Sequence, residues 1–237
     1  MKKQIFVVLD TETTKRNGLV FDAGWTSVDR TGEHYGKGSY LFRDVLVKDD
    51  PFYRHKIANY WEMAWQHDVR PITFANFRDR FNRHLNKLRK QNFEPIICAY
   101  NAAFDTRQLS LTAMTMLGKR FLTKPTRLLD IWDAWATSCP KRYIAEMSAA
   151  GNIRSRAEDV YRYEMGLPDF EEAHTGYEDT KIEAQILLKV LARKQTLPIV
   201  NHPSKFEPHP WKKVQDRVNK NINPTKEEIR DNFAPAA

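Results

Sequence analysis

The chain has 237 residues, of which 41% are hydrophobic and 12% aromatic, so wholesale disorder is excluded and one sizeable core can form. Its formal net charge of +8 favours a polyanionic partner, either a nucleic acid or an anionic surface. Two cysteines without C-x-x-C spacing argue against a disulfide framework or a zinc site. No stretch approaches the length of a membrane span, and a cytoplasmic location without membrane attachment is expected.

A buried strand followed by two carboxylates opens the chain. Residues 5–9 are continuously apolar, which is typical of a strand covered on both faces. Asp10 and Glu12 follow two residues apart and therefore point to the same side of the sheet. Like charges this close repel each other unless a cation lies between them, and Mg²⁺ prefers such oxygen ligands. A D-x-E triplet alone is most often a charged turn, so partner carboxylates decide its meaning.

The next elements predict a meander and a strongly amphipathic helix. Segments 19–28 and 33–42 alternate around a turn and are expected to pair antiparallel with the first strand. The aromatic-rich segment 49–70 also has helical spacing. Residues 74–90 are apolar on one face and basic on the other; we interpret the basic face as solvated, the alternative being a surface that follows phosphates. His84 on this helix is predicted to be a surface residue.

Two further strands are predicted, each followed by an acidic residue. Residues 95–100 resemble a buried strand, with Asn101 as the N-cap of the next helix. Asp105 would lie in the first turn of that helix, beyond the carboxyl end of the strand, where α/β sheets bind ligands. Residues 127–132 predict a fifth, short strand, and Asp130 is interpreted as a surface or capping residue.

The later part of the chain is predicted to be helical. Helices are expected over 140–150, over 155–165 and from Asp179 to residue 191. In the last of these, Asp179 shares a face with apolar residues, a costly place for an unpaired carboxylate.

From residue 196 the composition changes. The chain is predicted to divide into a domain at 1–195 and a proline-rich C-terminal extension at 196–237 with short helices. The second of these helices is signalled by a capping box at 225–228.

The order of these motifs resembles the DEDDh (DnaQ-like) 3′→5′ exonuclease superfamily, a branch of the ribonuclease-H-like fold. The likeness rests on D-x-E-T-T at Asp10–Thr14, N-x-x-F-D at Asn101–Asp105, and His174 five residues before Asp179. It extends over about residues 4–192 and implies an α/β fold with a mixed five-stranded sheet flanked by helices. The sister branch has tyrosine four residues before the last aspartate, where this chain has Thr175, so the histidine branch is favoured.

The resemblance also implies roles for the motif residues. It implies two Mg²⁺ or Mn²⁺ ions per site, with four carboxylate ligands at Asp10, Glu12, Asp105 and Asp179. His174 would be the general base that takes a proton from the attacking water, since its ordinary pKa lies near neutrality. Further substrate contacts are expected from Thr11, Thr13, Asn101 and Phe104.

The sequence therefore predicts a metal-dependent 3′→5′ exonuclease that releases nucleoside 5′-monophosphates from single-stranded nucleic acid, with DNA favoured over RNA. An exoribonuclease of the same family stays open, because the motifs contact phosphate and metal rather than the sugar. A non-catalytic nucleic-acid-binding or polymerase-associated subunit is a second alternative, against which the retention of all the motif residues argues. A basic adaptor acting through the extension would leave the carboxylates unexplained.

Overall fold

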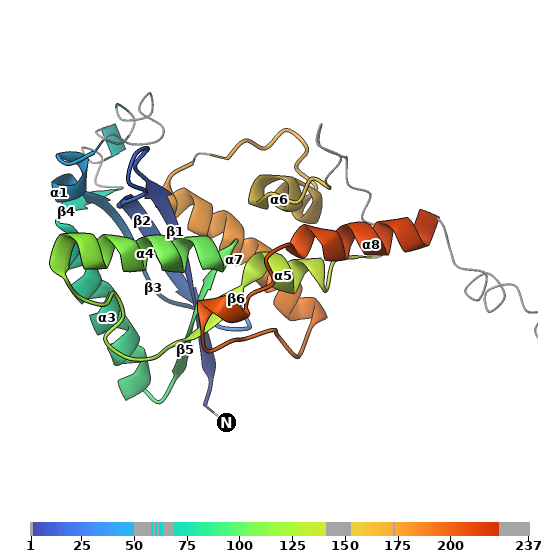
Figure 1. Cartoon of the computed structure of the whole chain (residues 1–237). Helices are drawn as coiled ribbons and strands as arrows, with labels where there is room; N and C mark the ends of the chain where they lie inside the picture. The colour runs from blue at the N-terminus through green and yellow to red at the C-terminus, as the bar shows by residue number, and fades with distance from the viewer. Residues whose placement is uncertain are drawn as a thin grey trace, which may run out of the picture.

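A six-stranded mixed sheet forms the centre of the computed structural model, which describes residues 2–49, 58, 60, 62, 63, 69–140, 153–172 and 174–222 (Figure 1). The strand order is β4-β3-β2-β1-β5-β6. The strands are β1 (Gln4–Thr13), β2 (Val20–Val28), β3 (His34–Phe42), β4 (Arg70–Ile72), β5 (Glu94–Ala99) and β6 (Arg127–Asp130).

Helices cover both faces of this sheet. The helices are α1 (Arg43–Leu46), α3 (Phe74–Lys90), α4 (Ala102–Leu117), α5 (Ile131–Ala136), α6 (Ala157–Met165), α7 (Gly176–Arg193) and α8 (Pro210–Ile222), with a 3-10 turn η2 at Pro203–Lys205. One apolar core packs α3 and α4 against the sheet, and a second packs α5, α6 and α7 against the other face (Figure 1).

The expected α/β fold is confirmed with one more strand than the resemblance implies. Strands β1, β2 and β3 form the predicted antiparallel meander, and β1 also pairs in parallel with β5. The added strand, β4, has three residues and pairs with the end of β3. A segment this short carries no readable alternation, so only its tertiary pairing defines it. The predicted strand at 127–132 ends at Asp130, where α5 begins.

The amphipathic helix predicted over 74–90 forms as α3. Thr73 caps it by accepting a hydrogen bond from Asn76 N at 3.2 Å, and its phenylalanines are buried against the sheet. The prediction that His84 is a surface residue is wrong. Its Nε2 lies 2.7 Å from Ser27 Oγ, and its ring packs at 4.2 Å from that of Trp25. Burial lowers the pKa of His84 to about 4, so this ring is neutral near pH 7.

The beginning of the extension packs on the same body as the domain before it. Val200 forms a β-bridge with Leu128, Val214 of α8 is fully buried in the core beside α5, and Lys213 pairs with Asp133. The boundary at residue 195 stays a prediction. The predicted helix that the capping box at 225–228 would open, the predicted helix at 140–150 and most of segment 49–70 lie outside the described residues. Within the described ranges, no helix has the length and hydrophobicity of a membrane span.

Candidate active site

The first two predicted carboxylates lie at the end of the central strand. Strand β1 continues to Thr13, and its residues Phe6 and Val8 face the core formed with α7. Because side chains alternate along a strand, Asp10 and Glu12 project from that same face. Both remain partly accessible to solvent, whereas the strand before them is buried.

Asp105 approaches β1 from the first turn of α4. It is 2% exposed, and Thr11 Oγ1 donates a hydrogen bond of 2.7 Å to its Oδ1. Thr11 is itself buried, so its side chain positions this carboxylate; its expected contact with substrate stays a prediction.

The start of α4 is held by Asp130 rather than by Asn101. Asn101 occupies the predicted N-cap position with a left-handed backbone, φ of 66°, but its side chain forms no cap hydrogen bond. Asp130 Oδ2 accepts the hydrogen bond from Ala102 N at 3.0 Å, while its Oδ1 caps α5 through Asp133 N. The capping interpretation of Asp130 is confirmed, but the residue is buried and connects two helices.

The third group of residues comes from α7 and the segment before it. Asp179 lies in the first turn of α7 and is 5% exposed. Candidate ligand atoms of Glu12, His174 and Asp179 lie within 4.8 Å of one another. His174 has a left-handed backbone with φ of 53°, and its Nδ1 lies 3.6 Å from Glu172 Oε2. The imidazole therefore reaches the carboxylates contributed by β1 and α7.

A carboxylate that the sequence reasoning missed completes this group. Glu183 lies one turn after Asp179 on α7, is 3% exposed, and accepts a hydrogen bond of 3.1 Å from Tyr100 N. The sequence spacing could have identified Glu183, because a residue four positions after Asp179 lies on the same helical face.

The remaining predicted substrate contacts lie around this group. Thr13 is half-buried at the end of β1, and Asn101 is exposed just before α4. Phe104 is half-buried, with the guanidinium of Arg107 at 5.9 Å from its ring centre. Their contact with a substrate stays a prediction.

The crowded carboxylates change one another's ionisation. Burial, followed by the charges of Glu183, Asp105, Asp179 and Glu12, raises the pKa of Asp10 well above its ordinary value. Burial raises the pKa of Asp105 to about 7, although the hydrogen bond from Thr11 opposes this shift. The pKa of Glu183 is also raised, by burial and then by Asp105. The group therefore disfavours full ionisation near neutral pH unless positive charge is added, and oxygen-rich anionic clusters of this kind fit hard divalent cations.

A second buried aspartate anchors the segment that carries His174. Asp22 of β2 is fully buried, and its Oδ2 accepts hydrogen bonds from Gly176 N at 2.7 Å and from Tyr60 Oη at 3.0 Å. Tyr60 Oη also lies 3.3 Å from the carbonyl oxygen of His174. Burial raises the pKa of Asp22 to about 6, while these hydrogen bonds act in the opposite direction. Asp22 thus ties the beginning of α7 to the sheet.

Two glycines allow this close approach. A Cβ on Gly24 of β2 would lie 2.3 Å from the backbone of Gly176, and one on Gly176 would lie 2.7 Å from Gly24 N. Backbone therefore packs directly on backbone where β2 meets α7, and no larger residue fits at either position without displacement. This contact sets the position from which Asp179 and His174 reach β1.

Two hollows in the surface are lined by residues other than the four predicted carboxylates. One of about 1230 Å³ is lined by the first residues of β1 and β5, and one of about 400 Å³ lies beside α4 and η2. Neither lining includes Asp10, Glu12, Asp105 or Asp179.

No protein-family model and no curated protein sequence matches the chain. Its fold is similar to solved 3′-exonucleases. A 3′-exonuclease described in 3′-end-specific recognition of a histone mRNA stem-loop superposes with a TM-score of 0.56 at 9% identity, covering 87% of this chain and 94% of that one. A full-length 3′-exonuclease gives 0.52 at 10% identity with the same coverage.

A third structure, E. coli Exonuclease I with a 5cy-dT13 oligonucleotide, gives a TM-score of 0.47 at 12% identity, covering 82% of this chain but 42% of that one. At such low identities the first two superpositions show the fold alone. The chain has the α/β fold, with a mixed sheet flanked by helices, that these two 3′-exonucleases have.

Proposed function

We propose that this chain is a metal-dependent 3′→5′ exonuclease that hydrolyses phosphodiester bonds of single-stranded nucleic acid and releases nucleoside 5′-monophosphates. One observation carries the proposal. Carboxylates from β1, α4 and α7, far apart in the sequence, lie close enough to Asp10 at the end of β1 to raise its pKa, and ligand atoms of Glu12 and Asp179 lie within 4.8 Å of His174. They do so in a fold that two solved 3′-exonucleases share.

The residues divide the chemistry among them. Asp10, Glu12, Asp105 and Asp179 would hold two Mg²⁺ or Mn²⁺ ions, which when bound supply positive charge to the phosphate oxygens of an in-line displacement. Thr11 keeps Asp105 oriented, and the Asp22–Gly176 hydrogen bond keeps the start of α7 against the sheet. The imidazole of His174 takes the proton from the attacking water, as the histidine of the DEDDh branch would.

The identity of the sugar is a separate part of the proposal. The sequence favours DNA, but the structure with the TM-score of 0.56 belongs to an enzyme described with an mRNA stem-loop, which favours RNA as the second candidate. Distinguishing the two requires a contact to the 2′-hydroxyl. Matched DNA and RNA oligonucleotides of one sequence would assign the preference through their relative rates.

The decisive experiment follows a 5′-labelled single strand over time. With Mg²⁺ or Mn²⁺ we expect a ladder that shortens from the 3′ end and stops when a chelator is added. Asp10→Asn should abolish the ladder, because it removes a charge from the centre of the carboxylate group while keeping the side-chain volume. An intact oligonucleotide with either metal, bound but not cleaved, would favour the non-catalytic alternative.

A further inference from the structure

The positive charge of the chain is concentrated on one part of its surface. We call residues 74–94 and 118–127 the basic surface. Its cationic residues are Arg78, Arg80, Arg83, Lys87, Arg89, Lys90, Lys119, Arg120, Lys124 and Arg127. Its acidic residues are Asp79 and Glu94. The excess of positive charge equals the formal net charge of +8 for the whole chain, so the remaining residues balance to zero.

Hydrogen bonds and ring packing join the two segments of the basic surface. Arg78 Nε donates to the carbonyl oxygen of Arg120 at 2.8 Å, and Arg89 Nη2 donates to Thr126 Oγ1 at 2.6 Å. Beneath them the ring of Phe121 stacks on α3, 5.6 Å from the ring of Phe81. Cations held on a fixed frame lose less conformational freedom when they bind a regular partner.

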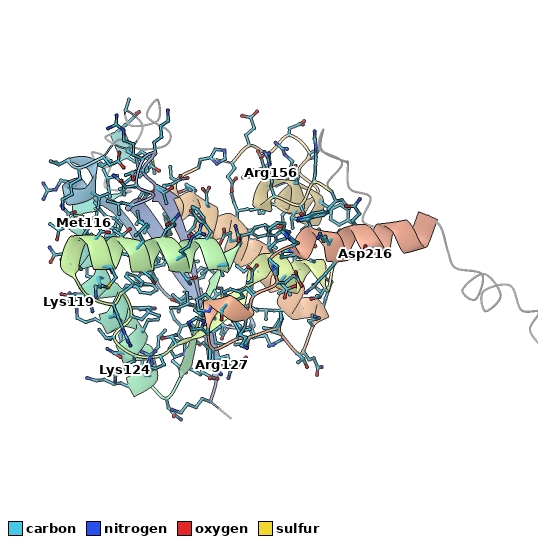
Figure 2. The ribbon with its side chains drawn as sticks, viewed as in Figure 1. Met116, Lys119, Lys124, Arg127, Arg156 and Asp216 are labelled. Carbon is cyan, nitrogen blue, oxygen red and sulfur yellow. The ribbon has the colours of Figure 1, made fainter. Side chains whose placement is uncertain are left out.

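Seven of the ten cations are exposed, Arg78, Arg89 and Arg127 being half-buried, and the cations outnumber the acidic residues beside them. Arg80, Arg83, Lys87 and Lys90 are exposed and follow one another at intervals of three, four and three residues, which places them on one side of α3. Figure 2 shows Lys119, Lys124 and Arg127 along the segment that leads from α4 to β6. The two acidic residues of the basic surface form ion pairs with its own cations: Asp79 with Arg78 at 3.1 Å and Glu94 with Arg127 at 2.8 Å.

The basic surface lacks an exposed ring on which a nucleobase could stack. Its aromatic residues Phe74, Phe77, Phe81 and Phe121 are buried, and Phe93 is half-buried with its ring 5.3 Å from that of Tyr35. Single-strand-binding surfaces combine cations with stacking rings, whereas duplex binding without base readout depends on phosphate contacts. Helix α3 has 17 residues and a length of about 25 Å, which corresponds to about seven base pairs of duplex.

We propose that the basic surface binds the phosphate backbone of duplex nucleic acid, so that the preferred substrate is a duplex with a single-stranded 3′ end. This inference extends the proposed exonuclease function by naming its substrate class. Asp10, Glu12 and Asp179 lie on the α7 side of the sheet, where Asp105 approaches the end of β1 from α4, while α3 covers the opposite face. A very short single strand at the carboxylates therefore leaves the basic surface empty, and the two contacts can be tested separately.

The test compares two charge-reversed variants of equal net charge. The first is Lys87→Glu with Lys124→Glu, on the basic surface. The control is Lys189→Glu with Lys212→Glu, two exposed lysines on α7 and α8. Binding to a duplex of about 20 base pairs with a short 3′ overhang, roughly three times the length of α3, is measured in chelator by fluorescence anisotropy over a range of salt.

We expect the first variant to bind the duplex about tenfold or more weakly at about 0.1 M salt, with a salt slope reduced by about two, because two phosphate contacts are lost. The control pair should bind as the parent chain does, and both variants should cleave a trinucleotide at the parent rate. Equal weakening by both pairs would mean that net charge alone acts, and would overturn the proposal. So would unchanged duplex binding, or weakening seen only with a single strand of equal length.

Failure of this inference is distinguishable from failure of the proposed function. If the parent chain cleaves the single strand and the first variant binds duplex normally, the exonuclease proposal stands and the duplex-binding proposal is rejected. If the parent chain binds duplex through Lys87 and Lys124 but cleaves no strand with either metal, the duplex-binding proposal stands and the exonuclease proposal is rejected.

Discussion

Glu183 adds a fifth carboxylate to the four that the motifs predicted. It is buried within the charge field of Asp105 and Asp179, and both charges, after burial, raise its pKa. Its hydrogen bond from Tyr100 N also connects α7 to the end of β5. A neutral side chain of the same shape can therefore keep this hydrogen bond. The negative charge of Glu183, in contrast, is repelled by the neighbouring carboxylates when no metal is bound.

We expect Glu183→Gln to raise the melting temperature in chelator by about 2 °C or more, the shift that about 1 kcal/mol produces in a chain of this size. The glutamine oxygen can still accept from Tyr100 N, while one like charge leaves the group. Glu183→Ala is the matched control and should lower the melting temperature, because it loses the hydrogen bond and opens a cavity. Differential scanning calorimetry measures both. Equal destabilisation by the two variants would contradict a repulsive charge at this position.

His174 is tested by a residue that tolerates its backbone. Asparagine accepts left-handed φ values better than most residues, so His174→Asn should fold normally. The cleavage rate should fall by about 10²–10⁴-fold, as expected for the loss of a general base. His209→Asn, at an exposed position in the extension, should cleave at the parent rate. A His174→Asn enzyme with near-parent rate would remove His174 from the proton transfer.

At the scale of elements, the contact between β2 and α7 sets the position of His174 and Asp179 relative to β1. Asp22 and Gly24 lie on β2, far in sequence from α7. Asp22 accepts a hydrogen bond from Gly176, and the missing side chain of Gly24 lets the Gly176 backbone pack directly on β2. The segment before α7 also carries the left-handed His174. A rigid anchor at this point keeps Asp179 and His174 aimed at β1.

Gly24→Ala should displace the start of α7, because its Cβ would meet the Gly176 backbone at 2.3 Å. We expect a loss of about 1–3 kcal/mol in the free energy of unfolding, typical of overpacking, together with a loss of cleavage in the protein that remains folded. Gly118→Ala is the control: its φ of 60° strains any other residue, but its Cβ would have nothing within 4 Å. Stability should fall there without loss of cleavage per folded molecule. Parent activity in folded Gly24→Ala would show that the anchor does not position the site.

At the scale of the whole molecule, buried carboxylates link stability to pH. Burial raises the pKa of Asp22 and Asp130 to about 6 and that of Asp105 to about 7. Unfolded aspartates titrate near about 3.9, so the folded chain binds more protons than the unfolded chain between those values. The free energy of unfolding from these groups therefore decreases as pH rises from about 4 to 7, and stays at the lower level above that range.

We accordingly expect the metal-free chain to gain stability from pH 8 towards pH 5 through these groups, and Mg²⁺ or Mn²⁺ to raise the melting temperature more at pH 8 than at pH 5. Cations favour the ionised carboxylates that the higher pH provides. Asp105→Asn should reduce both the pH dependence in chelator and the metal response. Thermal melts at both pH values, with and without metal, measure this. A metal response that is equal at the two pH values would contradict carboxylate binding.

The order of the motifs made much of the architecture predictable. Alternation and helical periodicity act between neighbours in the chain, so the meander, the helix at 74–90 and the strand before Asp105 could be predicted. Three residues depended on contacts that periodicity does not encode. The spacing of α3 places His84 on a face predicted to be solvated, whereas in the fold its ring contacts Ser27 of β2; Asp22 has no visible role in the sequence and bonds Gly176 only in the fold. Asn101 lies at the predicted N-cap position, but the side chain that bonds the start of α4 is that of Asp130, at the end of β6.

The sequence by itself determined which elements form and which side chains could carry the chemistry, because both follow from local spacing and from the residues' own groups. The tertiary structure alone decided that β2 clamps the start of α7, that Glu183 joins the carboxylates, and that segment 118–127 completes the basic surface with α3. Each of these depends on segments distant in the chain packing together, and the energy of such contacts exists only once the chain has folded.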